Sequence, residues 1–233
     1  MLTLRPANER GHIDHGWLNT YHTFSFADYH DPAHTHFRSL RVINEDRIAA
    51  GRGFGMHPHR DMEIITYILS GEIEHEDSMG NSGIIRAGDV QRMSAGTGIV
   101  HSERNSSNEP VHLLQIWIFP HHHGIHPSYE QRTFHDQDKR NTFCRIASHD
   151  GQNDSLTIHQ DASVYASIVS DGAVLKHHFI AGRGGYLQVV RGTVSVNEQK
   201  LHHGDGLVIE DEHEVLITAP ENGEAEFLLF DLG

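Results

Sequence analysis

The stretch that decides the fold is Gly51-Arg52-Gly53-Phe54-Gly55-Met56-His57-Pro58-His59, which is answered further along the chain by His101-Ser102-Glu103. Each segment carries two metal-binding side chains at a spacing of two residues. On a β-strand, side chains two residues apart leave the same face, about 6.5–7 Å apart along the chain. Two such pairs on separate strands can enclose a divalent first-row transition metal, and the absence of a thiolate argues against a structural zinc site built on cysteine. The candidate ligands are therefore His57, His59, His101 and Glu103.

Composition excludes several classes of protein. The chain has 233 residues, a formal net charge of −14 and one cysteine, Cys144. The negative charge and the scarcity of lysine disfavour direct binding to nucleic acid, which depends on clustered Lys and Arg. No apolar run is long enough for a membrane helix, and Met1–Arg5 lacks the apolar core of a signal peptide. We expect a reduced, cytoplasmic protein without internal disulfides.

The pattern of hydrophobic residues predicts an all-β protein. Short β-branched or aromatic runs are bounded by Gly, Asp, Asn or Pro, and no long segment shows a helical period. The expected strands include residues 40–44, 63–69, 113–119, 186–190, 193–196, 206–209 and 225–230.

The sequence also repeats itself weakly. Residues 68–73 are echoed by 189–194, and residues 86–90 by 202–206, at similar offsets along the chain. Two copies of one β-unit explain this, with a join between Pro127 and Asp150. The same offsets carry the four candidate ligands onto one histidine and three apolar residues, so the second copy lacks a metal-binding set: His178, Ile180, Ile217 and Ala219.

These residues resemble the cupin superfamily. Its first motif is matched by Gly51, His57-Pro58-His59, Glu63 and Gly71, and its second by Gly88, Gly96, His101 and Asn105. Three departures from these motifs resemble the pirin family: Ser94 in place of proline, two extra residues before His101, and the added carboxylate of Glu103. Five blocks in that family's order carry the resemblance: His22–Tyr29, Ser39–Asp46, His57–Glu63, His75–Gly80 and Ser94–Glu103.

The resemblance implies a bicupin of two antiparallel β-barrel (jelly-roll) domains. Residues 1–130 would form a metal-binding pirin-type cupin and residues 131–233 a degenerate cupin without metal. The family's metal ligands fall on the four candidates already reached from spacing. We expect one divalent ion, with Fe(II) as the first choice because it activates O₂, while Zn, Mn, Ni, Co or Cu fit the same donors.

The resemblance also implies quercetin 2,3-dioxygenase activity, in which O₂ opens the central ring of a flavonol and carbon monoxide is released. Glu103 would be the base that takes the proton of the flavonol hydroxyl. The partners would then be a flavonol-like substrate and O₂, and we expect a monomer. Three alternatives remain open: a pirin-like regulatory protein that acts through a protein partner, a metal that only stabilises the barrel, and a physiological substrate that is unrelated to flavonols.

Four further residues allow two interpretations each. Glu63 either orients a ligand imidazole or binds the metal itself. Phe54, Met56 and Trp117 either line a substrate cavity or belong to the core. We interpret the histidines at 121–123 and 126, beside Pro120, Gly124 and Pro127, as a loop rather than a site.

Overall fold

The structure, a computed structural model, describes all residues from Met1 to Gly233 and divides into two compact units. Unit 2 comprises Gly11–Thr133 and Leu156–Gln160, and unit 1 comprises Met1–Arg10, Phe134–Ser155 and Asp161–Gly233. The main break follows Thr133, close to the expected division after residue 130. Two short segments differ from that expectation, because the N-terminal strand belongs to unit 1 and residues 156–160 belong to unit 2.

Unit 2 is built from two antiparallel sheets. The larger has the strand order β12-β9-β6-β11-β4-β3-β2 and the smaller has the order β5-β10-β7-β8. The strands are β2 (Gly11–Asp14), β3 (Leu18–His22), β4 (Leu40–Ile48), β5 (Gly53–His59), β6 (Glu63–Ser70), β7 (Glu72–Asp77), β8 (Ser82–Arg86), β9 (Asp89–Ser94), β10 (Ile99–Arg104), β11 (Val111–Ile118) and β12 (Ser128–Thr133). The short strand β14 (Leu156–Thr157) also falls in this unit.

The two sheets of unit 2 pack face to face over a shared apolar core. One buried cluster joins Ile48 and Ile68 of the larger sheet to Ile73 and Ile85 of the smaller sheet. A second cluster joins Ile64, Met93 and Ile99 in the same way. Apolar side chains from both sheets thus meet between them, which is the arrangement expected of a sandwich or flattened barrel.

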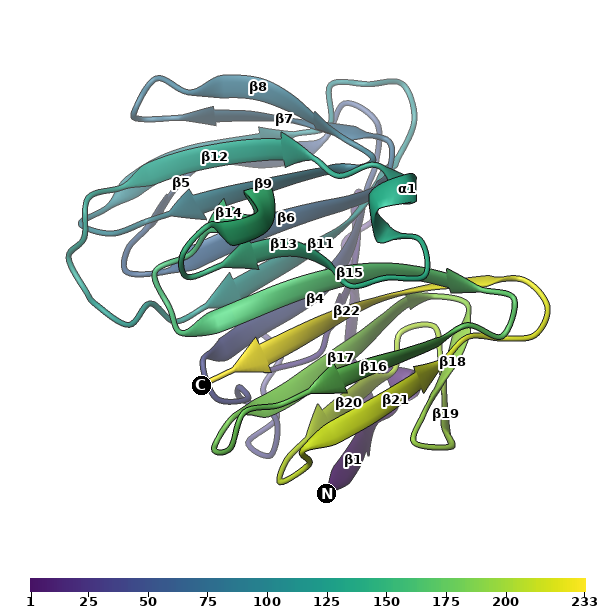
Figure 1. Ribbon diagram of the computed structural model, residues 1–233. Coiled ribbons are helices and arrows are strands. Elements are labelled where there is room, and N and C mark those ends of the chain that lie inside the picture. The colour runs from purple at the N-terminus through teal and green to yellow at the C-terminus, as the bar shows by residue number, and fades with distance from the viewer. The chain divides into compact units, whose positions relative to one another are not determined.

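Unit 1 has the same construction. Strand β22 (Glu224–Leu232), yellow in Figure 1, lies between β15 (Ala162–Ser170) and β17 (Gly184–Arg191) in a sheet of order β1-β20-β17-β22-β15-β13. The second sheet has the order β16-β21-β18-β19. The remaining strands are β1 (Leu2–Arg5), β13 (Cys144–Ser148), β16 (Val174–His178), β18 (Thr193–Val196), β19 (Gln199–His202), β20 (Gly206–Ile209) and β21 (Glu214–Thr218). Helix is confined to α1 (Asp136–Lys139) and two short 3₁₀ turns, η1 (Ala7–Glu9) and η2 (Gln152–Asp154), so the all-β prediction is confirmed.

The predicted internal repeat is confirmed by strand order and by turns. The order β9-β6-β11-β4-β3 in unit 2 corresponds to β20-β17-β22-β15-β13 in unit 1, and β5-β10-β7-β8 corresponds to β16-β21-β18-β19. The matched turns even share their backbone conformation. Gly71 and Gly192 have φ of 77° and 76°, and Gly88 and Gly204 have φ of 90° and 83°. Glycine is favoured at all four because other residues rarely adopt positive φ.

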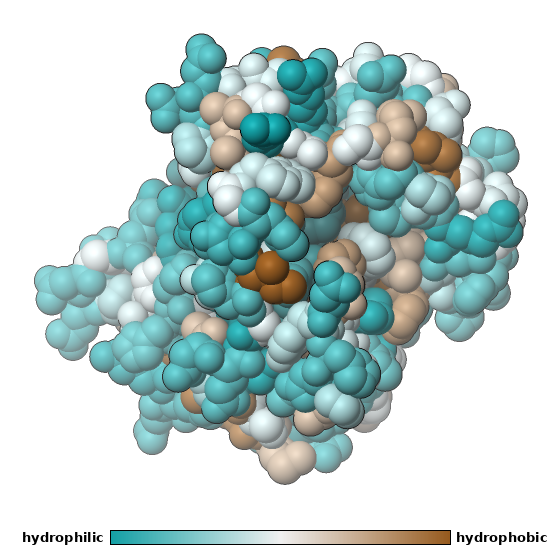
Figure 2. Space-filling view, turned by 180° about the vertical axis from the view of Figure 1, so that it is seen from behind, coloured by the Kyte–Doolittle hydropathy of each residue, from teal (hydrophilic) through white to brown (hydrophobic).

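The face in Figure 2 is largely hydrophilic, with hydrophobic side chains in small separate groups, in keeping with the net charge of −14. None of the helices is both long enough and apolar enough to cross a membrane.

The pairing of β5 with β10 contains a β-bulge. His101 lies opposite His57, but Glu103 lies opposite Phe54, so β5 carries one more residue than β10 between these pairs. A bulge of this kind changes which face of the strand a side chain leaves. Phe54 and His57 are an odd number of residues apart and yet both line the interior cavity of unit 2.

Gly53 allows the close approach of β5 to β10 beside this bulge. A Cβ at Gly53 would lie 2.2 Å from the carbonyl oxygen of Glu103, whereas a Cβ at Gly55 would meet nothing within 4 Å. We predict that Gly53→Ala lowers the free energy of unfolding by about 1–3 kcal/mol, because the two strands must separate. Gly55→Ala is the matched control and should stay within about 0.5 kcal/mol of the parent. Denaturant unfolding measures both, and equal stability of the two variants would contradict this account.

Candidate metal centre

Three imidazoles from two neighbouring strands meet inside unit 2. His57 and His59 come from β5 and His101 from β10, and one ring nitrogen of each lies within 4.8 Å of the other two. The ring centroids of His57 and His101 are 4.4 Å apart, and those of His59 and His101 are 4.9 Å apart. The alternation along β5 and the register with β10 therefore bring together three of the four candidate ligands. This is a histidine-based metal-binding site.

Hydrogen bonds fix how two of these rings face the centre. The Nδ1–H of His57 donates to the carbonyl oxygen of Gly55 at 2.8 Å, across the bulge, which leaves Nε2 free for a metal. Behind His101, the Nε2–H of His75 donates to Oδ2 of Asp77 at 3.2 Å, and His75 Nδ1 lies 3.5 Å from His101 Nδ1. The series of contacts from Asp77 through His75 to His101 therefore places the proton of His101 on Nδ1 and leaves the lone pair on Nε2.

The residues present fit a transition metal. Nε2 of His101 is buried and has no hydrogen-bond partner. An unpartnered buried nitrogen costs free energy unless something binds it. Three neutral imidazoles converging on one point are a donor set for Fe, Ni, Cu or Zn, and they leave further coordination positions open.

Burial and neighbouring rings keep His59 and His101 neutral. Burial, together with the neighbouring ring of His57, lowers the pKa of His59 to about 4. Burial and the surrounding imidazoles lower the pKa of His101 to about 2. Both rings are therefore uncharged at neutral pH, with one nitrogen lone pair available, which is the state in which imidazole binds a metal.

Glu103 lines the same cavity but is held beside the three-histidine group rather than within it. The side-chain amide of Gln115 donates to both carboxylate oxygens of Glu103, at 3.2 and 3.0 Å, and the Thr66 hydroxyl donates to Oε1 at 3.4 Å. Burial raises the pKa of Glu103, while His75 and the hydrogen bond from Gln115 act in the opposite direction. The carboxylate is thus fixed in orientation by neutral donors and is easier to protonate than an exposed glutamate.

Phe54 and Trp117 line the metal cavity, whereas Met56 does not. The cavity has a volume of about 300 Å³ and also contacts the apolar core, because Phe54 and Trp117 pack against buried clusters. Trp117 stands edge-on to His59, with ring centroids 5.0 Å apart. Both interpretations of Phe54 and Trp117, as cavity wall and as core, therefore apply together.

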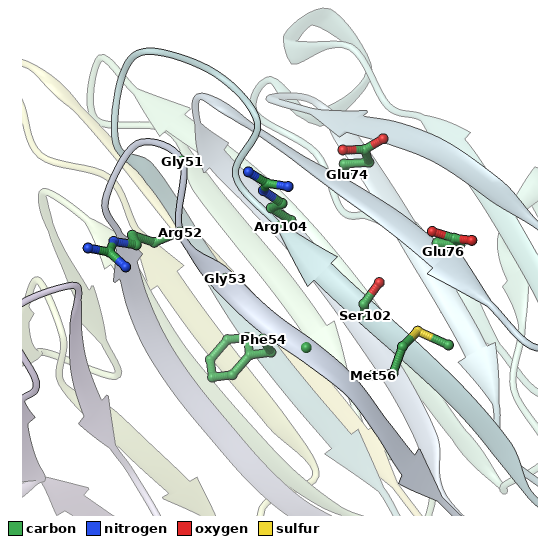
Figure 3. Close-up of a pocket in the computed structure, with 10 residues that line it drawn as sticks. Gly51, Arg52, Gly53, Phe54, Met56, Glu74, Glu76, Ser102 and Arg104 are labelled. Carbon is green, nitrogen blue, oxygen red and sulfur yellow. The ribbon is translucent and has the colours of Figure 1, made fainter.

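Met56 lies on the outer face of the smaller sheet. It is 58% exposed and lines an open depression of about 600 Å³ with Ser102, Arg104, Glu74 and Glu76 (Figure 3). No ligand imidazole lines this depression, which is larger than the metal cavity and shares only Phe54 with it. The bulge explains the outcome, because it turns Phe54 inward and leaves Met56 outside.

Glu63 is placed away from the three imidazoles. Its side chain is buried on β6, where Oε2 accepts a hydrogen bond from the Ser94 hydroxyl at 2.8 Å and Oε1 lies 3.4 Å from Nδ1 of His159. The carboxylate therefore neither joins the cluster nor contacts one of its rings in this structure. Strand β6 belongs to the larger sheet, and its start pairs with the end of β9, which directs Glu63 towards Ser94.

Sequence reasoning missed the residues that support the site. Asp46 also lines the cavity. Gln115 and Thr66 donate to the carboxylate of Glu103, and His75 and Asp77 stand behind His101. One signal was available for two of them, because His75 and Asp77 repeat on β7 the two-residue spacing of His57 and His59. The others are single polar residues within apolar strands, and only the register of those strands places them at the cavity.

The matching positions of unit 1 are apolar. Ile217 and Ala219, which the repeat aligns with His101 and Glu103, are buried in its apolar core, and His178 is exposed. The inward histidine is instead His177, whose Nε2–H donates to Oδ2 of Asp231 at 2.8 Å. The interior of unit 1 is therefore filled by packing.

The contacts from Asp77 through His75 to His101 predict that His75 raises the metal affinity of the site. His75→Phe keeps a ring but removes the nitrogen that orients His101, so we expect metal affinity to fall roughly 10–100-fold. Competition with a chromogenic chelator measures this loss. Glu76→Gln, on the outward face of the same strand, is the control and should bind metal as the parent does. Unchanged affinity in His75→Phe would show that His75 does not orient the ligand.

Asp46 predicts a pH dependence of stability. Burial raises the pKa of Asp46 from 3.8 to about 7, the nearby hydroxyl of Thr20 acts in the opposite direction, and Glu103 and Glu45 raise the pKa further. Between these two values the folded state holds a proton that the unfolded state has lost, so stability falls as pH rises from about 4 to 7. Asp46→Asn should remove this loss.

The Asp46→Asn variant should therefore be more stable than the parent at pH 8, by on the order of 1–4 kcal/mol. The difference should shrink as pH falls and disappear below about pH 4, where the parent carboxyl group is protonated. Denaturant unfolding of the metal-free proteins at several pH values tests this. A difference that does not vary with pH would contradict it.

Comparison with known proteins agrees with this geometry. Residues 3–118 match the family described as Pirin, and residues 145–232 match the quercetinase C-terminal cupin domain. The chain is 50% identical to a protein of Escherichia coli (strain K12) named quercetin 2,3-dioxygenase, over 100% of this chain and 99% of that one. A pirin-like protein of Caulobacter vibrioides is 43% identical over 99% of each chain.

Solved structures show the same fold. The crystal structure of YhhW from Escherichia coli superposes with a TM-score of 0.95 at 50% identity, covering 100% of this chain and 98% of that one. A complex of bacterial pirin YhhW with nickel(II) gives a TM-score of 0.94 at 49% identity, covering 100% and 99%. The predicted bicupin architecture is thereby confirmed, and the chain belongs to the pirin family of the cupin superfamily.

Proposed function

We propose that this protein is a metal-dependent dioxygenase that opens the central ring of flavonols such as quercetin with O₂ and releases carbon monoxide. The observation that carries the proposal is a three-histidine cluster with an unpartnered buried Nε2 on His101, beside a buried carboxylate in a cavity with aromatic walls. The name of the Escherichia coli relative supports the choice of reaction.

We further propose that the ligands are His57, His59, His101 and Glu103, and that the native ion is Fe(II). A divalent iron at this position supplies a Lewis acid and a means of activating O₂.

The chain's own residues would handle the proton of the substrate. Glu103 is buried, so its pKa is raised and it can accept a proton from a flavonol hydroxyl and keep it. Gln115 and Thr66 hold this carboxylate in one orientation, which keeps the acceptor oxygen directed at the substrate. Phe26, Phe54 and Trp117 form aromatic walls that suit a flat ring and exclude water.

The test is anaerobic loading of Fe(II) onto protein purified without nickel resin, followed by air and quercetin. We expect bleaching of quercetin and release of carbon monoxide in step with O₂ uptake. His101→Ala should lose both metal and turnover. Glu103→Gln should retain more metal than activity, with turnover lower by roughly 10²–10⁴-fold, the range expected when a general base is lost.

His122→Ala is the matched control, because His122 is exposed in the loop after β11 and lies outside the cluster. It should keep full metal content and full activity. Metal-loaded parent protein that releases no carbon monoxide and leaves quercetin intact would refute the proposal.

A further inference from the structure

The metal cavity contains a polar group that the proposed reaction does not use. Asp46 lies on β4 and lines the cavity together with Glu103 and Trp117. Its side chain is 5% exposed, and Oδ1 is buried without a hydrogen-bond partner. Buried acceptors are almost always satisfied in folded proteins, and an unsatisfied one costs about 1–3 kcal/mol. A carboxyl oxygen left in this state beside a cavity therefore points to a ligand.

Two neighbouring polar groups of the cavity are already engaged. Oδ1 of Asn44 accepts a hydrogen bond from Nδ1–H of His22 at 2.8 Å, and the amide of Gln115 is bound to Glu103. The acceptor of Asp46 is thus available to a molecule that enters the cavity, and either protonation state of a carboxyl group offers an acceptor oxygen.

The walls limit what that molecule can be. Trp117 packs edge-on against both Phe26 and His59, with centroid distances of 5.2 and 5.0 Å, so the indole is held rigidly at the cavity. Its Nε1 is likewise buried without a partner. A flat aromatic molecule with several polar substituents matches an aromatic wall, a metal cluster and a separate carboxyl acceptor.

We propose that Asp46 recognises a second hydroxyl group of the substrate, distinct from the oxygen directed at the metal cluster, and so selects polyhydroxylated aromatic substrates. This inference rests on the proposed function, because it assigns a specificity-determining residue to the same cavity. The substrate hydroxyl donates to Oδ1 of Asp46 and supplies the hydrogen bond that the folded protein lacks. Molecules without that hydroxyl leave the carboxyl oxygen buried and unsatisfied.

The experiment compares binding of two flavonols to metal-loaded protein without oxygen, so that no turnover is needed. Quercetin carries additional ring hydroxyls, whereas 3-hydroxyflavone carries only the hydroxyl beside the carbonyl group. Quenching of tryptophan fluorescence gives Kd for each. We expect the parent to bind quercetin at least about tenfold more tightly, the gain of one hydrogen bond to a buried acceptor.

Asp46→Leu removes the acceptor at similar volume, and the preference should fall to within about twofold, with weaker binding of quercetin and no loss for 3-hydroxyflavone. If the Asp46→Leu protein does not fold, Asp46→Ala tests the same loss of preference. Asp46→Asn keeps an acceptor oxygen and should retain part of the preference. Glu45→Gln is the matched control, because Glu45 is a buried carboxylate of the same strand that contacts His112 and does not line the cavity.

Metal content and melting temperature are measured for every variant, so that loss of the site is separated from loss of recognition. A parent-like preference for quercetin in a folded, metal-loaded Asp46→Leu or Asp46→Ala protein would overturn the inference. The two proposals fail separately. Binding that depends on Asp46 without ring opening in air refutes the dioxygenase and keeps the recognition role, whereas turnover with no dependence on Asp46 does the reverse.

Discussion

The antiparallel pairing of β5 with β10 is the constraint on which the site depends. It sets His57 directly opposite His101, and the bulge that follows sets Glu103 opposite Phe54. A shift of one residue in this register would turn the ligands to the outer face, because side chains alternate along a strand. Gly53 makes the close approach of the strands feasible, and the carbonyl of Gly55 receives the Nδ1–H of His57. The same few backbone positions therefore define both the fold and the ligand geometry.

The cavity carries a concentration of polar groups that the fold does not satisfy. His101 Nε2, Asp46 Oδ1 and Trp117 Nε1 are all buried without hydrogen-bond partners, and all three residues line one cavity. Each costs free energy in the folded state, and stability supplied elsewhere has to offset that cost. Unsatisfied polar atoms of this kind are expected at a site where a bound ligand supplies the missing hydrogen bonds or metal bonds. The tight hydrogen bonding of Glu103 shows the opposite strategy, in which neutral donors fix a carboxylate that must keep one orientation.

The parts of the fold that follow from local pattern could be predicted from the sequence. Alternating apolar residues predicted the all-β class, and the Gly-containing turns at Gly71 and Gly192 predicted the repeat because both positions need positive φ. The ligand histidines were predictable because each pair lies on one strand, with the residues of a pair two apart. The inward position of Phe54 was not, since the bulge that produces it depends on pairing with a distant strand. Asp46 and Gln115 were missed for the same reason, because nothing local separates them from other polar residues of a strand.

The two units share one strand order but have different interior side chains. Their strand orders correspond, yet the position of His101 on β10 is matched by Ile217 on β21, which is buried in apolar packing. The histidine that does face the interior of unit 1, His177, is bound by Asp231, which also accepts hydrogen bonds from Arg183. His177 thus uses Nε2 for this hydrogen bond and belongs to no group of side chains that could hold a metal ion. The two units therefore differ not in the order of their strands but in their inward side chains. In the metal-binding unit, several of these side chains carry polar atoms that lack hydrogen-bond partners within the protein.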